Sequence, residues 1–404
     1  MTRGSWSDVL PVHPRRVAVA GWGVLALLNL SAGVVIASWP ERQSDLESMR
    51  GWVQQWLIDG TNLYATPGTL TDYPPHAIVA LTPLAVLPAE WMVPVWAVFN
   101  LALAVLAPYL ALRIARPGWP LRTLLLPLLM FLCWGGSRTL LQFSLLALVS
   151  SLLGMKLADR RPGWSGICLG LALMKPQIAA PFLLWAILTR RLQTVIVALI
   201  VVAAGLVIFC VFAHAGPLDV LRGYTGILGA LYLLDEDLRM VGLAQLRPLI
   251  LLAAPDIDLA SAVAIALAIG TLIVVVIVGI RERSRPAEFS IGAPPLAAVW
   301  SLLTFYHLTY GFLLLLPVAT LLIFTNDAST RPLRRAVFWI MQAALMFDIP
   351  GMWPRIAGLI VPEQPAPFAA LASHADRLLM AALFVCLLMI ARQARPALNA
   401  PDRI

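Results

Sequence analysis

The sequence predicts an all-α protein that crosses a membrane many times, and three observations lead to this fold class. Of the 404 residues, 60% are hydrophobic and only 12% are charged, and the mean hydropathy is +0.84. A soluble domain of this size could not bury so much apolar surface. Apolar runs recur along the whole chain, and the first, 17–39, exceeds the ~20 residues of a spanning helix. The arginines cluster between these runs, as in the cytoplasmic loops of membrane proteins.

The basic clusters fix the predicted topology. If every cluster lies in the cytoplasm, each interval between clusters contains an even number of crossings. The clusters are Arg15/Arg16, Arg113/Arg116/Arg122, Lys156/Arg160/Arg161, Arg190/Arg191, Arg281/Arg283/Arg285, Arg331/Arg334/Arg335 and Arg392/Arg395. Both ends of the chain are then expected in the cytoplasm.

This constraint gives about twelve membrane helices, several of them shorter than a full span. They are 17–39, 91–114, 121–133, 140–157, 163–174, 178–188, 194–214, 259–280, 291–306, 308–324, 336–347 and 377–391. The short ones require tilt, shielding or a locally thinned bilayer. Residues 1–404 are expected to form a single integral membrane domain. Its outer loops are about 40–88, with juxtamembrane helices, 215–258 and 348–376.

Lys175 is the most unusual residue of this pattern, because it lies within the apolar stretch "GLALMKPQ". Pro176 follows it, and a proline within a helix breaks the hydrogen-bond ladder. Two short helices that meet near Lys175 and Pro176 keep both flanking arginine pairs inside and place Lys175 at the outer tip. A charge in the membrane indicates function by default. The alternative is that Lys175 snorkels to the outer headgroups.

The same topology places other polar residues on the outer side. These are Asp45, Tyr64, Asp72, Tyr73, His76, Arg138, Gln142, Gln177, His307 and Tyr310. A carboxylate near apolar surface can act as a general base, and a histidine can relay a proton. Lysine and arginine suit a phosphate. This set suits transfer from a lipid-phosphate donor at a membrane surface.

Several of these residues have a simpler interpretation that the sequence leaves open. Asp45 resembles a solvated loop acid, and His307 an interfacial histidine bonded to backbone. His76 follows a Pro-Pro corner and is also consistent with a structural role, while Arg138 could snorkel. Tyr64 and Tyr73, with Trp91 and Trp96, could form an interfacial aromatic belt.

Other site classes have little support in the sequence. The four cysteines lie in apolar segments without metal-ligand spacing. The acidic run at Asp235–Asp237 is expected on a solvated loop, although a divalent cation there is not excluded. No basic run alternates with aromatic residues, so no nucleic-acid partner is expected. We expect no cofactor and no metal site.

The order of the motifs resembles glycosyltransferase family 87, polytopic enzymes of the GT-C class. The first outer loop has "SDL", "NLY", "DYPP" and "LTPLAVLP", and "LLQFS", "GLALMKPQ" and "LLTFYHLTY" follow. The resemblance covers roughly residues 15–320. The chain departs from the family where Leu141 replaces a glycine, where Ser144 replaces an asparagine, and where His307 stands alone instead of in a pair.

The resemblance implies an inverting membrane glycosyltransferase with a GT-C fold. The donor would be a polyprenyl-phosphate sugar, typically mannose, and the acceptor a hydroxyl of a glycolipid or glycan on the outer, periplasmic face of a bacterial cytoplasmic membrane. Asp45 would be the base and His307 its support. Lys175 and Arg138 would neutralise the phosphate and Gln142 would contact sugar or phosphate. Tyr64, Tyr73, His76, Gln177 and Tyr310 complete the candidate substrate-binding set.

Three other functions remain open from the sequence. A transporter or flippase of a lipid-linked or small substrate would show charges inside several spans and symmetry between its halves. A different GT-C enzyme would keep the fold and change the donor and acceptor. A non-catalytic scaffold would leave the convergent polar set without a role.

Overall fold

The computed structural model describes helices and their connections over most of the central part of the chain. The described residues are mainly 44–66, 71–115, 142–238, 257–284, 292–305 and 375–393, with a few short pieces elsewhere. Within these residues every regular element is helical. Three of the described helices are long and apolar enough to cross a membrane, over Ala89–Ile114, Leu192–Phe212 and Asp258–Arg281. The all-α prediction is confirmed for this part of the chain; the total of twelve remains a prediction.

The bundle is organised around α10 (Leu192–Phe212), whose length and composition suit a full crossing. The shorter helix α8 (Pro162–Ala172) lies along it in the same direction. A Cβ atom on Gly166 would lie 2.6 Å from the carbonyl of Thr194, and one on Gly170 would lie 2.9 Å from that of Ala198. The two glycines therefore allow the two backbones to touch. Exposed Ile and Val side chains on α10 are suited to lipid.

Helices α8 and α10 begin at the same level but end at different ones. The hydroxyl of Thr194 donates to the carbonyl of Pro162 at 3.3 Å, which joins the two first turns. At 1.5 Å per residue, the 11 residues of α8 rise about 16 Å and the 21 residues of α10 about 31 Å. The end of α8 therefore lies near the middle of α10.

Three further short helices run between the same two levels. They are α7 (Ser144–Leu157), α9 (Pro176–Leu188) and α14 (Ala293–Thr304). The hydroxyl of Ser165 in α8 donates to the carbonyl of Gly154 in α7 at 2.7 Å, so these two helices are antiparallel neighbours. The hydroxyl of Ser301 in α14 donates to the carbonyl of Gln177 in α9 at 2.6 Å. One end of each short helix thus lies at mid-level, beside the end of α8.

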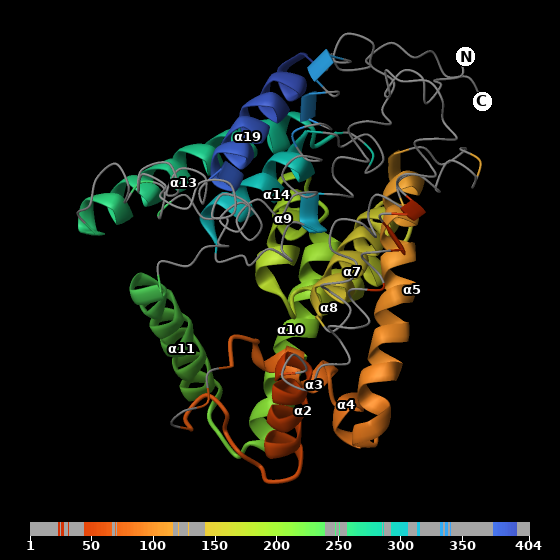
Figure 1. The fold of residues 1–404 in the computed structure, drawn as a ribbon, viewed down its shortest axis with the longest axis vertical. Helices are drawn as coiled ribbons and strands as arrows, with labels where there is room; N and C mark the ends of the chain where they lie inside the picture. The colour runs from red at the N-terminus through yellow and green to blue at the C-terminus, as the bar shows by residue number, and fades with distance from the viewer. Residues whose placement is uncertain are drawn as a thin grey trace.

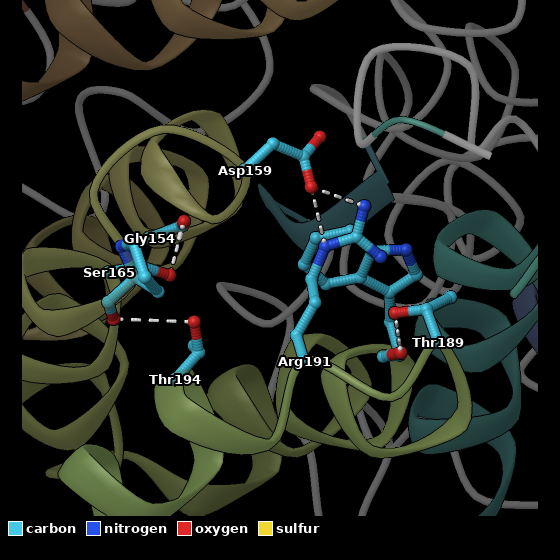
Figure 2. A network of polar contacts seen from close by, with 8 residues as sticks. Gly154, Asp159, Ser165, Thr189, Arg191 and Thr194 are labelled. Carbon is cyan, nitrogen blue, oxygen red and sulfur yellow. Dashed lines mark hydrogen bonds and ion pairs between the residues drawn. The ribbon is translucent and has the colours of Figure 1, made fainter. Parts of the chain in front are cut away.

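The other ends of these helices form what we call the basic end of the bundle, which carries Lys156, Arg160, Arg161, Arg190 and Arg191. Figure 2 shows its polar contacts, where Arg191 donates to Asp159 at 2.7 and 3.0 Å. The guanidinium of Arg191 also lies 4.4 Å from the ring centroid of Trp185. Helix α13 (Ile257–Arg281) ends here too, because a Cβ on Gly279 would contact Leu188 at 2.5 Å.

The carboxylate of Glu282 joins α13 to α14 at this end. It accepts the N–H groups of Gly292 and Ala293, both at 3.0 Å, and its side chain is buried. The first N–H groups of a helix have no partner within the helix, and an acid there also suits the helix dipole. Glu282 therefore fixes where α14 begins. Helix α19 (Ala375–Gln393) packs on α14 beside α13, as Figure 1 shows.

The opposite end of the bundle is built by part of the first predicted outer loop, residues 44–66 and 71–88, which we call the first outer segment. It contains α2 (Ser44–Leu57), α3 (Pro75–Ala80) and α4 (Pro83–Val86), which lie together at the lower end of Figure 1. Arg50 donates to the carbonyl of Leu87 at 3.1 Å, and Gln54 donates to that of Ala85 at 3.4 Å. These residues are four apart on α2, so one face of α2 holds the end of α4. The expectation of helices in this segment is confirmed, and their place at the outer membrane surface stays a prediction.

The predicted membrane segments agree with the helices wherever both are described. Helix α5 (Ala89–Ala115) corresponds to 91–114, and α7 to α10, α13, α14 and α19 lie within a few residues of their predicted bounds. One expectation is wrong. The predicted loop 215–258 is not only a loop, because α11 (Pro217–Leu238) occupies its first half and includes Asp235–Asp237. Most of the predicted segments 17–39, 121–133, 308–324 and 336–347 lies outside the described residues.

Candidate functional site

The candidate site forms at mid-level, where α8 ends and α9 begins. Lys175 is the residue between them and has extended backbone angles, φ −121° and ψ 86°. A residue before proline is sterically excluded from the helical conformation, and Pro176 is well suited to the first position of a new helix. The Lys-Pro pair therefore ends one helix and starts the next. The predicted break at Lys175 and Pro176 is confirmed.

The ammonium group of Lys175 is buried, with 3% of the residue exposed. Nζ donates to Oε1 of Gln142 at 3.2 Å and to Oγ of Ser144 at 3.1 Å. The ring of Tyr73 lies below it, with 5.4 Å between Nζ and the ring centroid. Two neutral oxygens and an aromatic face therefore orient a buried cation. Burying a charge in this way is costly, and proteins retain it mainly where it functions.

The start of α7 supplies both hydrogen-bond acceptors of Lys175. The amide nitrogen of Asn100 in α5 donates to the backbone carbonyl of Gln142 at 3.0 Å, which holds this turn. Between the two acceptors, Phe143 packs against Tyr73 edge-on at 5.6 Å and against Trp96 at 4.8 Å. Long-range contacts from α5 and the first outer segment thus define the geometry around Lys175.

A network of tyrosines holds Tyr73 in place. The hydroxyl of Tyr64 donates to the carbonyl of Tyr73 at 2.7 Å, and that of Tyr224 in α11 donates to the carbonyl of Asp72 at 3.4 Å. Burial raises the pKa of Tyr64 well above its usual value, and Tyr224 and the carboxylate of Asp72 raise this pKa further. Tyr64 therefore keeps its proton and remains a donor. In this structure Tyr64 supports the site rather than facing Lys175.

His76 and Gln177 were also predicted as site residues. Neither has a described hydrogen bond to the ammonium group of Lys175. His76 is buried in the first turn of α3, against Gly205 of α10. Gln177 follows the Lys-Pro break, and its backbone carbonyl accepts the hydroxyl of Ser301. The aromatic-belt alternative does not fit Tyr64 and Trp96, whose exposures of 5% and 7% place them in the core.

The structure also gives the level of Lys175 along α10. Lys175 lies at the junction of the two short helices, as expected, and these helices end partway along α10: Gly170 packs level with Ala198 and Val201, and Lys175 lies one turn further on. In the same register, Lys175 is level with about Gly205 of α10. Gly205 is seven residues from the end of α10 at Phe212, which corresponds to about 10 Å. The break therefore lies well below the opposite end of α10.

Four predicted residues cannot be placed with their side chains. Asp45 belongs to the first turn of α2, but only its backbone is described. Arg138, His307 and Tyr310 lie outside the described residues. Their roles remain predictions from the sequence.

Sequence reasoning missed several residues that complete the site. Ser144 was noted only as a departure from a family pattern, yet it contacts Nζ directly. The only sign of this contact in the sequence was that Ser144 follows the predicted site residue Gln142 by two positions. The hydrogen bonds of Asn100 and Ser301 join residues 42 or more positions apart, and Phe143 contributes by packing against other rings. A single sequence does not reveal such pairs.

Among the described residues, no group of three or more His, Cys, Asp or Glu side chains could hold a metal ion. The side chains of Asp235–Asp237 are not among those described. The described part of the site offers a cation, amide and hydroxyl oxygens, and aromatic faces. Such groups bind an anion and polar hydroxyls without a metal.

The helices and the buried cation define an all-helical membrane protein with a polar site enclosed by half-length helices. The family model for glycosyltransferase family 87 matches residues 71–294, which is more than half of the chain. The chain belongs to this family and is a membrane glycosyltransferase. No curated protein and no solved structure matches the chain.

Proposed function

We propose that this glycosyltransferase moves a sugar from a polyprenyl-phosphate donor to a hydroxyl of a glycolipid or glycan, and that this sugar is mannose. The observation that carries the proposal is the buried ammonium group of Lys175, held by Gln142 and Ser144 at the junction of α8 and α9. A lysine is suited to a phosphate as a compact point charge. A site within the membrane-spanning part of the bundle is suited to a phosphate carried on a lipid.

The depth of the site favours a lipid-linked donor over a soluble one. The end of α8 lies near the middle of α10, so the surrounding helices shield Lys175 on the side of the bilayer. Electrostatic attraction between the ammonium group and a phosphate is stronger here than in water. A polyprenyl chain can remain in the bilayer while its phosphate reaches this level.

The proposed reaction is a single displacement with inversion at the anomeric carbon. The acceptor hydroxyl oxygen attacks this carbon while the bond from carbon to the phosphate oxygen breaks. The hydroxyl proton passes to Asp45, and polyprenyl phosphate leaves with the bonding electrons. Lys175 and Arg138 stabilise the charge on the phosphate, and His307 supports Asp45 or orients the phosphate.

The remaining candidates have supporting roles in this proposal. Tyr73 and Gln142 orient Lys175, and Tyr64 holds Tyr73. Gln177 and Tyr310 are proposed to contact the sugar or the acceptor. We further propose that the reaction needs no metal, and turnover that survives EDTA is the expected result.

We further propose that the site faces the outer side of a bacterial cytoplasmic membrane, with both chain ends in the cytoplasm. The arginine-rich basic end, which carries Lys156, Arg161 and Arg191, is the end expected in the cytoplasm. The first outer segment, with α2 and Asp45, forms the opposite end. Trp164 and Ile58 are both exposed, so each can be replaced by cysteine. The side of a vesicle from which each cysteine can be labelled then measures this orientation.

The deciding experiment is a transfer assay with purified protein, radiolabelled polyprenyl-phosphate-mannose and a membrane glycolipid extract. Wild type, Asp45→Asn, Lys175→Ala and Lys175→Arg are compared. The only other lysine, Lys156, is exposed at the basic end, so Lys156→Ala is the matched control. We expect label in the extract with wild type and Lys156→Ala, and losses of about 100-fold or more for Asp45→Asn and Lys175→Ala.

The other outcomes are equally informative. Full turnover by Lys175→Ala would remove the phosphate-binding role of this residue. Full turnover by Asp45→Asn would assign the base to another acid. Transfer from a nucleotide sugar but not from the lipid donor would overturn the donor class. Absence of transfer together with movement of the lipid-linked sugar across a vesicle membrane would favour the flippase alternative.

A further inference from the structure

His76 is the most deeply buried histidine among the described residues and has no hydrogen bond in this structure. It is the second residue of α3, directly after the Tyr-Pro-Pro corner, and 5% of it is exposed. Neither Nδ1 nor Nε2 has a hydrogen-bond partner. Buried polar groups in proteins are nearly always bonded, because an unmet donor loses the hydrogen bonds that water gave it. A purely structural position here would be better filled by an apolar residue.

Glycines on two helices make the space that His76 occupies. A Cβ atom on Gly205 of α10 would overlap the Cβ of His76, so α3 rests directly on this helix. On α8, the backbone carbonyl of Gly170 lies within range to interact with the imidazole ring. His76 therefore lies where α3, α8 and α10 meet, which is one helical turn from the start of the Lys175 break.

The end of α8 leaves the carbonyl of Gly170 without its regular helical partner. In a continuing helix the N–H of Met174 would donate to Gly170, but it donates to Leu171 at 3.1 Å instead. The N–H of Lys175 likewise donates to the carbonyl three residues before it, at 3.1 Å. The last turn is thus tightened, and helix ends of this kind commonly recruit a side-chain donor. An imidazole N–H is such a donor.

We propose that His76 is a positioning residue, whose imidazole N–H bonds the carbonyl of Gly170 and thereby fixes the turn that presents Lys175. The proposal rests on the proposed function, since it assigns His76 to the phosphate-binding side of the same site. The bond is not formed in this structure, where both imidazole nitrogens are without a partner, and the end of α8 must move toward α3 for it to form. His76 then acts through Lys175 and need not touch the substrate.

The first test compares three variants in the transfer assay and in thermal unfolding. His76→Leu removes both nitrogens, while His76→Asn and His76→Gln place an amide N–H near the position of Nδ1 or Nε2. We expect His76→Leu to change the unfolding temperature little, because the loss of one hydrogen bond is offset when an apolar side chain replaces a buried polar ring. Its turnover should fall about five- to tenfold, the effect of one hydrogen bond, and one of the two amide variants should recover it.

A double-mutant cycle then asks whether His76 acts through Lys175. In the Lys175→Ala background, His76→Leu should cause no further loss of turnover, because residues that act on one step are not additive. Additive losses would overturn the proposal. Equal losses of turnover and of unfolding temperature in all three His76 variants would also overturn it, since they would show a packing role.

The second test does not depend on enzymatic activity. The chain has two lysines, so selective ¹⁵N-lysine labelling gives two backbone amide signals, which Lys156→Arg assigns. We expect His76→Leu to move the signal of Lys175 and leave that of Lys156 unchanged, and the active amide variant to restore it. An unmoved Lys175 signal overturns the proposal. If the transfer assay fails for wild type, this measurement still decides whether His76 holds the Lys175 turn.

Discussion

The indole of Trp56 donates its N–H to the carbonyl of Phe209 at 3.0 Å, across 153 positions of sequence. Their rings stack at 5.5 Å with an interplanar angle of 6°. This pair attaches α2, the helix that begins beside Asp45, to the last turn of α10. Both residues are buried. The placement of the proposed base relative to the bundle therefore depends on this contact.

Trp56→Phe should separate the hydrogen bond from the stacking. We expect a loss of about 1 kcal/mol in unfolding free energy, the typical contribution of one hydrogen bond, and a larger relative loss of turnover because α2 shifts. Thermal unfolding and the transfer assay measure the two effects. Trp164→Phe, at an exposed tryptophan on α8, is the control. Unchanged stability and turnover in Trp56→Phe would contradict this account of α2.

Gly166→Ala should loosen the contact between α8 and α10. The new Cβ would lie 2.5 Å from Cβ of Val197 and 2.6 Å from a backbone oxygen, so the helices must separate at a cost of about 1–3 kcal/mol. Turnover should fall with it, because α8 leads to Lys175. Gly163→Ala on the same helix meets no atom within 4 Å and should be neutral or slightly stabilising. Equal unfolding temperatures for the two variants would refute the close packing.

Ser144→Ala removes one oxygen that orients the ammonium group of Lys175. We expect turnover to fall by about three- to tenfold, as for the loss of a hydrogen bond to a charged group, and Ser144→Thr to retain more of it. Ser151 on the same helix is also buried, but its hydroxyl bonds only the carbonyl of Ala147. Ser151→Ala should therefore leave turnover near wild type. A similar loss in both alanine variants would argue against a special role for Ser144.

Asp159→Asn tests the ion pair at the basic end, which is remote from the proposed chemistry. The Arg191 and Asp159 side chains are 9% and 42% exposed. Because the carboxylate of Asp159 faces solvent, we expect the pair to contribute about 1 kcal/mol or less, and salt screens it. We expect a small drop in unfolding temperature at low salt, no drop at 1 M salt and unchanged turnover. A large loss of turnover would show that this end takes part in the reaction.

The helices were predictable from the sequence because their signals are local. Hydropathy located α5, α10 and α13, and the arginine clusters located the ends of the short helices. The break between α8 and α9 followed from Pro176, whose ring restricts the residue before it. The helix α11 was missed because its polar start and acidic end resemble a solvated loop.

The depth and surroundings of Lys175 could not be predicted in the same way. Depth depends on the register in which Gly166 and Gly170 meet α10, and packing of distant residues sets this register. The contacts with Ser144 and Tyr73 likewise join segments 31 or more positions apart. A sequence indicates that a buried lysine needs partners, but not which partners the fold provides.

The unequal lengths of α8 and α10 impose a geometric requirement on the molecule that receives the sugar. If the donor phosphate binds beside Lys175 as proposed, the acceptor hydroxyl must reach a level about 10 Å from the Phe212 end of α10. In the proposed reaction, a bulky, branched acceptor that holds its hydroxyl close to a large headgroup would not bring this hydroxyl to the level of Lys175. Acceptors that carry the hydroxyl on a slender stem fit this requirement, so in the proposed reaction the unequal helix lengths would select acceptors by their shape.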